Sequence, residues 1–366
     1  MRLTGAREFV HGGLQRAAVL LINLGTPQAP TAGAVRRYLG EFLWDPRVVE
    51  LPRWIWWPIL HGLVLAIRPR RSAAKYAAVW TARGSPLLVG SQRQAAALTS
   101  ELAQRGLELD VTLAMRYGEP SIAGALQQLQ SRSVGRILIV PLYPQYSATT
   151  TGSAMDGVNA VLGTVRDLPE TRWIKHFPDE PGYIEALRDS VRSHWERHGR
   201  GECLLMSFHG LPRRNLELGD PYHCECQKTA RLLAEALALS APAYRVSFQS
   251  RFGRARWLEP STSDTLGELA RGGARQLDVI CPGFVADCLE TLEEIVIEGQ
   301  AQFLAAGGQA LRYIPCLNDS PGFIRVLADL VQRNVQGWPV EAAQQATRAS
   351  EARHSAELAV KMGAPR

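Results

Sequence analysis

The stretch CLLMSFHGLP, residues 203–212, indicates the fold class of this chain of 366 residues. It begins as an apolar run with the length and residue types of a buried parallel strand, and it stops at a histidine, a glycine and a proline. An amphipathic stretch at 225–239 separates it from the next apolar run at 244–248. Apolar runs that alternate with longer amphipathic stretches are typical of an α/β protein with a parallel sheet.

The same alternation extends in both directions along the chain. Further strands are predicted at 18–22, 111–115, 136–140, 277–281 and 311–313. Helices are predicted at 92–104, 121–130, 152–165, 182–197, 263–271, 288–305 and 321–332. Two βαβα series of similar rhythm predict two doubly wound, Rossmann-like domains with parallel sheets. In such sheets the ligand lies beyond the carboxyl ends of the strands, so we expect the active site in the interdomain cleft.

The proline-rich junction FPDEP at 177–181 marks the expected domain boundary. We therefore expect a first domain at 17–177, a second at 178–316, a helix at 317–336 that packs back on the first domain, and a tail at 340–366. The tail is rich in Ala, Gln, Arg and Glu with little apolar periodicity, so it is expected to be a frayed helix or disordered.

Composition excludes several classes of protein. A hydrophobic content of 46% and a charged content of 21% are those of a folded globular chain. The net charge of +6 comes without a dense Lys/Arg run interleaved with aromatics, so nucleic acid is not an expected partner. Acidic lipid headgroups or a carboxylated ligand suit this charge equally well.

Six cysteines, all in the second half, are too sparse for a secreted disulfide scaffold and favour a reducing compartment. Residues 1–18 contain no apolar core of a signal peptide. We therefore expect a cytoplasmic protein.

One apolar segment, LPRWIWWPILHGLVLAI at 51–67, differs from the rest of the chain. It is shorter than the roughly 20 residues that span a bilayer. Its tryptophans Trp54, Trp56 and Trp57, with arginines on both flanks as far as residue 71, suit a lip that lies in a membrane interface. We expect peripheral association with the inner membrane through this lip, about 51–71. The alternative is a buried helix with a basic surface turn.

Two strand ends carry candidate acid–base groups. His209 follows a buried strand, where an imidazole near its ordinary pKa of about 6.5 can accept a proton; a structural histidine is the alternative. Glu290, Glu294 and Glu298 follow the 277–281 strand at a spacing of four. On a regular helix they form one acidic stripe, which is either a solvated face or a path for a divalent cation.

A third strand end, at 142–147, places Tyr143 and Ser147 before a hydroxyl-rich turn. Tyrosines beside such a turn suit a flat aromatic ligand with anionic arms, and Arg116-Tyr117 adds a cation and a ring. Each segment alone is an ordinary loop. Neither Leu24-Gly25-Thr26 nor the glycine turn at 84–86 matches a dinucleotide or P-loop fingerprint, so a nucleotide-binding fold is rejected.

Together these segments resemble the ferrochelatases over roughly 19–335. The matching motifs, in the order of the family, are INLGTP at 22–27, GSPL at 84–87, YPQYSATTTGS at 143–153, LLMSFHGLP with GDPY within 204–222, FQSRFGRARWLEP at 248–260 and PGFVADCLETLEE at 282–294. The resemblance implies a chelatase fold that holds a porphyrin in the cleft. It also implies an enzyme that inserts Fe(II) into protoporphyrin IX, with release of two protons, in the last step of haem synthesis.

The resemblance also assigns roles to single residues. His209 corresponds to the active-site histidine and Glu290 to the catalytic glutamate, and both are candidate ligands of the metal. Glu294 and Glu298 correspond to acidic residues that lead metal or protons along their helix. Porphyrin contacts are expected from Leu24, Tyr76, Arg116, Tyr117, Tyr143, Ser147, Trp173 and Trp257.

The chain departs from the family pattern at two positions. Cys288 follows Asp287, where many relatives have histidine, so metal ligation at that position is not expected. Ala148 stands where animal enzymes place a cluster cysteine, and no cysteine follows Cys316. We therefore expect no [2Fe–2S] cluster and no other resident cofactor. The single Cys-x-Cys at 224–226 lacks the paired spacing of a zinc site.

The residue before Gly25 bears on the substrate. Relatives that use coproporphyrin have tyrosine there, and Leu24 resembles the enzymes that use protoporphyrin. Four alternatives stay open: a coproporphyrin chelatase, a cobalt or nickel chelatase, a non-catalytic porphyrin or haem carrier, and a membrane-anchored scaffold suggested by 51–67 alone. The sequence does not indicate an oligomeric state.

Overall fold

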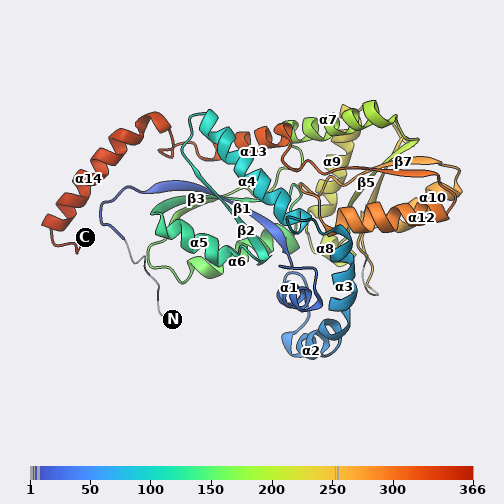
Figure 1. Cartoon of the computed structure of the whole chain (residues 1–366), viewed down its shortest axis with the longest axis horizontal. Helices are drawn as coiled ribbons and strands as arrows, with labels where there is room; N and C mark the ends of the chain where they lie inside the picture. Colours follow the sequence, from blue (N-terminus) through green and yellow to red (C-terminus); the bar gives the residue numbers. More distant parts are fainter. Residues whose placement is uncertain (1–2, 4, 6–8, 252, 254, 366) are drawn as a thin grey trace.

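The computed structural model describes residues 3, 5, 9–251, 253 and 255–365, and it contains two four-stranded parallel sheets (Figure 1). Phe252 and Arg254 of the 248–260 motif lie outside the described residues, as do several residues of the 1–18 stretch. The first sheet consists of β1 (Arg16–Thr26), β2 (Asp110–Gly118), β3 (Val134–Pro141) and β4 (Glu170–Trp173). The second consists of β5 (Cys203–His209), β6 (Tyr244–Gln249), β7 (Gln276–Ile280) and β8 (Ala310–Ile314).

Both sheets have the same strand order. The first reads β2-β1-β3-β4 and the second β6-β5-β7-β8, with parallel neighbours throughout. Each sheet therefore changes winding direction beside its first strand, and a ligand of such a sheet binds at the carboxyl ends there. The predicted doubly wound architecture is confirmed. The edge strand β4 was not predicted, because it has only four residues and none of them is buried.

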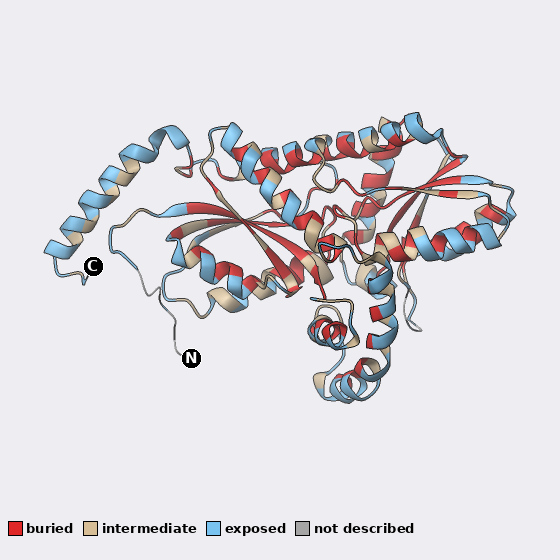
Figure 2. Cartoon of the chain, in the orientation of Figure 1, coloured by how far each residue is buried: buried red, intermediate tan, exposed pale blue. Residues whose placement is uncertain are grey.

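Helices cover both faces of the first sheet. One face packs on α5 (Ile122–Ser131) and α6 (Ser153–Leu162). The other face packs on α4 (Pro86–Gln104) and belongs to a core that continues into the second half. That core includes α7 (Pro181–His198), α9 (Tyr222–Ala236), α13 (Pro321–Asn334) and strand β5. Figure 2 shows the strands of both sheets as largely buried.

Helix α13 lies between α4 and α7 and packs against both, so the last core helix joins the two halves (Figure 1). The remaining elements of the second half are α8 (Arg213–Glu217), α10 (Thr262–Arg271), α11 (Leu289–Thr291), the π-helix η3 (Leu292–Gly299) and α12 (Gln300–Ala305). A short π-helix, η2 (Ala148–Gly152), precedes α6.

The apolar segment forms a projecting subdomain beside the first sheet. It comprises α1 (Ala32–Trp44), α2 (Arg53–Ile59), the π-helix η1 (Leu60–Val64) and α3 (Leu65–Val79), and it projects below the rest of the molecule in Figure 1. Trp54 is 79% exposed and Trp57 is 57% exposed. The expectation that Trp56 shares this exposed surface is wrong: Trp56 is 9% exposed, and its indole N–H donates to the Leu43 carbonyl at 2.7 Å.

The carboxyl-terminal tail is helical. After the 3₁₀ turn η4 (Ala342–Gln344), helix α14 spans Gln345–Lys361 and has no buried residue. Figure 2 shows it extending from the body as an exposed helix. Its Ala, Glu and Gln residues have high helix propensity, which accounts for a helix without an apolar face. Across the part of the chain that the structure describes, no helix combines the length and apolarity needed to cross a bilayer.

Candidate active site

His209 is the last residue of β5, beside the point where the second sheet changes direction. Its Nδ1 lies 2.6 Å from the Gly210 carbonyl oxygen, which only accepts hydrogen bonds. Nδ1 therefore carries the proton, and in the neutral ring Nε2 is the basic nitrogen. Gly210 is required here, because a Cβ at this position would lie 2.5 Å from the Gln249 carbonyl oxygen.

Glu290 lies across an interdomain crevice from the first half. The residues lining this crevice are Leu24, Gly25, Thr26, Tyr38, Tyr76, Ser85, Leu87, Cys288, Leu289 and Glu290. Burial, followed by the charge of Glu290, raises the pKa of the Tyr76 phenol well above its ordinary value. Three residues predicted for the site, Leu24, Tyr76 and Glu290, are thus brought together.

Glu294 adds a second carboxylate beside His209 and Glu290, and these three residues form the acid–base corner. Ser250 donates to it twice, from the backbone N–H to Oε1 and from Oγ to Oε2, each at 2.5 Å. Burial raises the pKa of Glu294, the Ser250 hydrogen bonds and the charge of His209 lower it, and the charge of Glu290 raises it. Since the charges of His209 and Glu290 both act on Glu294, the three predicted acid–base residues share one environment.

The helix that carries these glutamates is not the regular helix that was predicted. Residues Leu292–Gly299 form a π-helix, in which residues five apart are hydrogen-bonded. Lys75 on α3 contacts both Glu293 Oε2 (2.9 Å) and Glu298 Oε1 (2.6 Å), which are five apart. The side chain of Glu298 is therefore held by a lysine at the exposed end of the helix, whereas Glu294 turns toward Ser250.

In the first half, two predicted porphyrin contacts bond to other protein groups. Arg116 donates to Asp45 Oδ2 at 2.6 Å and to Ser153, and its guanidinium stacks on the Tyr117 ring. The buried Tyr117 hydroxyl also donates to Asp45, at 2.8 Å. Burial raises the pKa of Asp45, but hydrogen bonds from Ser153, the Arg47 N–H and Tyr117 outweigh it and hold that pKa below its ordinary value.

The remaining predicted contacts divide into two groups. Tyr143 and Trp257 each have a buried polar atom, Oη and Nε1, with no hydrogen-bond partner among the described residues. Trp257 also forms a backbone bridge with Pro212, three residues after His209. Trp173, in contrast, packs against the core between the first sheet and helices α5 and α6, which is the face away from the second sheet.

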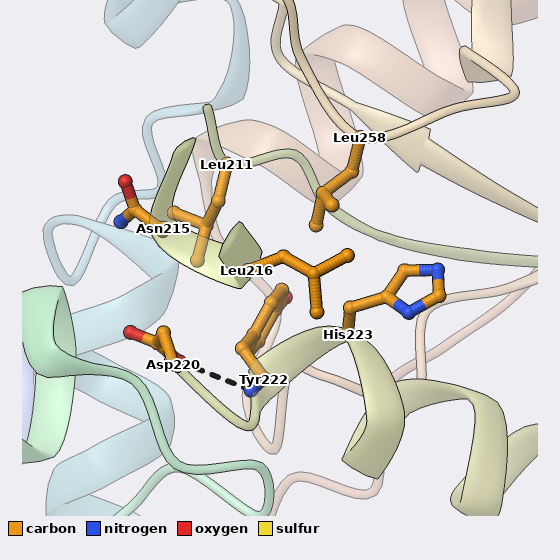
Figure 3. A pocket seen from close by; sticks show the side chains of 7 residues that line it. All are labelled: Leu211, Asn215, Leu216, Asp220, Tyr222, His223 and Leu258. Atoms are coloured by element: carbon orange, nitrogen blue, oxygen red, sulfur yellow. Dashed lines mark hydrogen bonds between the residues drawn. The ribbon is translucent and has the colours of Figure 1, made fainter. Parts of the chain in front are cut away.

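Ser147 belongs to a seam between the halves. It is fully buried and donates from Oγ to Asp220 Oδ2 at 3.0 Å, and the Ala148 N–H donates to the same oxygen at 2.8 Å. Asp220 also binds the Tyr222 N–H and lines a small crevice with Leu211, Asn215, Leu216, Tyr222, His223 and Leu258 (Figure 3). Neither His209 nor Glu290 borders that crevice, so Ser147 acts in the seam rather than at the acid–base corner.

Sequence reasoning missed several residues of the site. Tyr38 lines the crevice from α1 but stands in an amphipathic helix with no distinguishing pattern. Gln249 and Ser250 fall inside the recognised 248–260 motif, which gave no role to them. Within the described ranges, no group of three or more His, Cys, Asp or Glu has the geometry of a metal site.

The two sheets and their helices have the fold of solved chelatase structures. The structure of SirB from Bacillus subtilis with Fe3+ has the same fold, with a TM-score of 0.52, 13% identity, and coverage of 88% of this chain and 96% of that chain. The sirohydrochlorin chelatase SirB from Bacillus subtilis subspecies spizizenii in complex with cobalt aligns with a TM-score of 0.50 at 10% identity, over 88% and 97% of the two chains. At these identities the likeness concerns the fold alone.

Sequence comparison identifies the family. The Ferrochelatase family model matches residues 16–335. Ferrochelatase of a Polaromonas species is 57% identical over 364 residues, 98% of each chain. Ferrochelatase of Bordetella parapertussis is 58% identical over 327 residues, 89% of this chain and 90% of that one. The chain belongs to the ferrochelatase family, as its motifs predicted.

Proposed function

We propose that the protein inserts Fe(II) into protoporphyrin IX and releases two protons, the last step of haem biosynthesis. The observation that carries the proposal is the corner formed by His209, Glu290 and Glu294 at the interdomain cleft. It combines a basic imidazole nitrogen with two carboxylates whose charges interact. Family membership over residues 16–335 supports the same reaction.

Metal insertion requires a base that accepts pyrrole protons and a residue that presents the metal to the ring. A free porphyrin carries two pyrrole N–H protons that must leave before a divalent ion enters the ring. A cleft that binds the bent ring better than the flat one lowers the barrier to insertion. We assign acceptance of a pyrrole proton to His209 Nε2 and presentation of iron to Glu290. His209 can also bind iron only before Nε2 takes the proton, because the neutral ring has a single basic lone pair.

Glu294 and Glu298 are proposed to lead metal or protons along the π-helix. Glu294 lies deeper, within the electrostatic reach of His209, and Glu298 is at the exposed end beside Lys75. An exposed carboxylate bound by an exchangeable lysine is a suitable first contact for a hydrated divalent ion.

The proposed porphyrin contacts fall into a first rank, whose side chains can meet a ligand directly, and a second rank, whose side chains are engaged within the protein. Leu24 and Tyr76 border the crevice with Glu290, and Tyr143 and Trp257 offer buried donors to a ligand, so these four form the first rank. Arg116, Tyr117, Ser147 and Trp173 form the second rank, because their side chains bond or pack within the protein. Leu24 favours protoporphyrin over coproporphyrin. No resident cofactor is included in the proposal.

The lip is proposed to hold the protein on the cytoplasmic face of the inner membrane. Its large exposed apolar side chains are Leu51, Trp54, Ile55, Trp57, Ile59, Leu63 and Ile67. Contiguous exposed apolar side chains mark a membrane or protein contact, and tryptophan favours the lipid interface. A Trp54→Ser/Trp57→Ser variant should lose about tenfold in partition onto anionic lipid vesicles. Leu358→Ser on the exposed helix α14 is the control, and equal partition of the double variant and the wild type would contradict the proposal.

The test of the reaction is anaerobic metallation of protoporphyrin IX by the purified protein, measured as loss of free-base fluorescence. Ferrous iron is the metal, and coproporphyrin III competes as substrate. Turnover with preference for protoporphyrin supports the proposal and the role of Leu24. Preference for coproporphyrin, or for cobalt or nickel over iron, would replace it with another chelatase activity. Tight binding without turnover would indicate a carrier.

A further inference from the structure

We propose that the dipeptide Gln249-Ser250, at the end of β6, is a positioning clamp that holds Glu290 and Glu294 at fixed places relative to His209. The inference rests on the proposed function and deepens it. It assigns roles to two residues that do not belong to the acid–base corner themselves. The two residues act on successive segments of the same helix, α11 and η3, through three hydrogen bonds, and a fourth joins Gln249 to β5.

Gln249 connects the histidine strand to the glutamate helix. It is 3% exposed, and its Oε1 accepts from Ser207 Oγ on β5 at 2.7 Å. Its Nε2 donates to the backbone carbonyl of Glu290 at 2.7 Å. Ser207 is two residues before His209, so one buried amide connects the backbone at Glu290 to the strand that ends in the histidine.

Ser250 fixes the second carboxylate. Its N–H and Oγ bind separate oxygens of Glu294, each at 2.5 Å, so the carboxylate has one orientation. Short hydrogen bonds to an ionised acceptor are the strong ones. Ser250 reaches this position with a φ of +63°, a left-handed conformation that costs energy in any residue other than glycine. Such strain tends to occur at functional sites, where the surrounding structure holds it.

The clamp changes the electrostatic balance at Glu294. The charged groups that act on its pKa are His209 from β5 and Glu290 from α11, and Glu294 helps to raise the pKa of the Cys281 thiol that follows β7. Burial and Glu290 favour the protonated carboxyl, whereas Ser250 and His209 favour the carboxylate. The pKa of Glu294 stays above its ordinary value because burial outweighs the other causes, and Ser250 limits that rise, so the carboxylate can take a proton from His209 to lower pH than burial alone permits.

Ser250→Gly tests the hydroxyl alone, because glycine tolerates the left-handed conformation and keeps the N–H donor. Without Oγ the pKa of Glu294 rises, so the acid limb of kcat for metallation should move to higher pH by about one unit. The matched control is Ser261→Gly, which removes a serine hydroxyl bound to Asp264 (2.7 Å) at the start of α10. That control should leave the acid limb in place, and a shift equal to that of Ser250→Gly would overturn the proposal.

A measurement that needs no turnover tests the clamp independently of the proposed reaction. Infrared titration of the protein follows the carboxyl band of Glu294, assigned by its loss in Glu294→Gln. The midpoint should rise by about one unit in Ser250→Gly whether or not the protein metallates porphyrin. An unchanged midpoint overturns the clamp even if wild-type turnover is normal. A shifted midpoint in a protein without turnover overturns the proposed function and leaves the clamp standing.

Gln249→Leu tests the other half of the clamp. Ser207 Oγ keeps a partner in this variant, because it also lies 2.7 Å from Thr262 Oγ1. We expect about a tenfold fall in kcat as Glu290 loses its fixed place, with KM for protoporphyrin unchanged within about twofold. A rise in KM without a fall in kcat would mean that Gln249 contributes to ligand binding only, and would overturn its positioning role.

Discussion

Two corners of the molecule, one at the carboxyl end of each sheet, have the same topological surroundings and opposite chemistry. In the first half, Arg116, Tyr117 and Ser153 all direct donors at one oxygen of Asp45. In the second, His209 presents a basic nitrogen near two carboxylates, and neutral donors hold one of them. In the first corner the charge of Asp45 is neutralised by Arg116 and by hydroxyl donors. In the second corner the ionisable groups stay available for reaction. Similar strand ends therefore provide a structural contact in one half and acid–base groups in the other.

The largest expected effect comes from removing the base. His209→Ala should lower kcat for metallation by roughly 10³-fold, because a positioned general base contributes about 10²–10⁴. His223→Ala, in the separate crevice of Figure 3, is the control and should stay within about twofold. Stopped-flow fluorescence under anaerobic conditions measures both. A loss of equal size in the two variants would mean that the second corner has no special chemistry.

The next effect concerns stability rather than rate. Asp45→Asn should lower the free energy of unfolding by about 2 kcal/mol at pH 7, because Asp45 is buried with a cation and two hydroxyls. Asp156→Asn, whose partner Arg47 is exposed like Asp156 itself, is the control and should cost less than about 1 kcal/mol. Urea denaturation measures both, and kcat of Asp45→Asn should fall by less than about threefold.

The loss of unfolding free energy in Asp45→Asn should depend on pH in one direction. The pKa of Asp45 is lowered in the folded protein, so its contribution is complete above the ordinary carboxyl range, near pH 4. It is lost as the pH falls through the lowered value. The difference between wild type and Asp45→Asn should therefore shrink only in acid. A difference that grows on acidification would contradict the assignment of Asp45 as the charged centre of the first corner.

The parallel sheets could be predicted because their buried strands are continuous, mostly apolar runs, such as 19–22 and 204–208. Runs of this kind are stable as strands that are covered on both faces. Sequence reasoning also selected His209, Glu290 and Glu294 from their positions after strands. It could not predict that Arg116 and Tyr117 bond to Asp45, since that residue is about 70 positions away in the chain.

The π-helix is a second limit of sequence reasoning. The Leu289–Ala305 sequence has ordinary helical periodicity, and only tertiary contacts reveal the wider turn that sets Glu293 and Glu298 against Lys75. The exposed face of the lip was predicted from its tryptophans. Trp56 could not be separated from its neighbours, because its inward direction depends on packing against α1.

The smallest expected effect is at the outer end of the acidic helix. Lys75→Met removes the ammonium group from Glu293 and Glu298, so the apparent KM for ferrous iron should fall by about two- to threefold as the carboxylates attract the cation more strongly. Stability should fall as well, mainly because the buried Glu293 loses its cationic partner, whereas the exposed pair with Glu298 contributes little. Initial rates over a ferrous iron series measure the change, and a large fall in kcat would place Lys75 in the chemistry instead.

Metal insertion is proposed to depend on proton removal by His209 in the second corner. Single-turnover metallation of bound protoporphyrin IX, with a pH indicator and porphyrin fluorescence recorded together, tests it most directly. We expect release of two protons per ring, in step with the fluorescence change in the wild type and slowed equally with it in His209→Gln. Metallation by His209→Gln at the wild-type rate would contradict the claim.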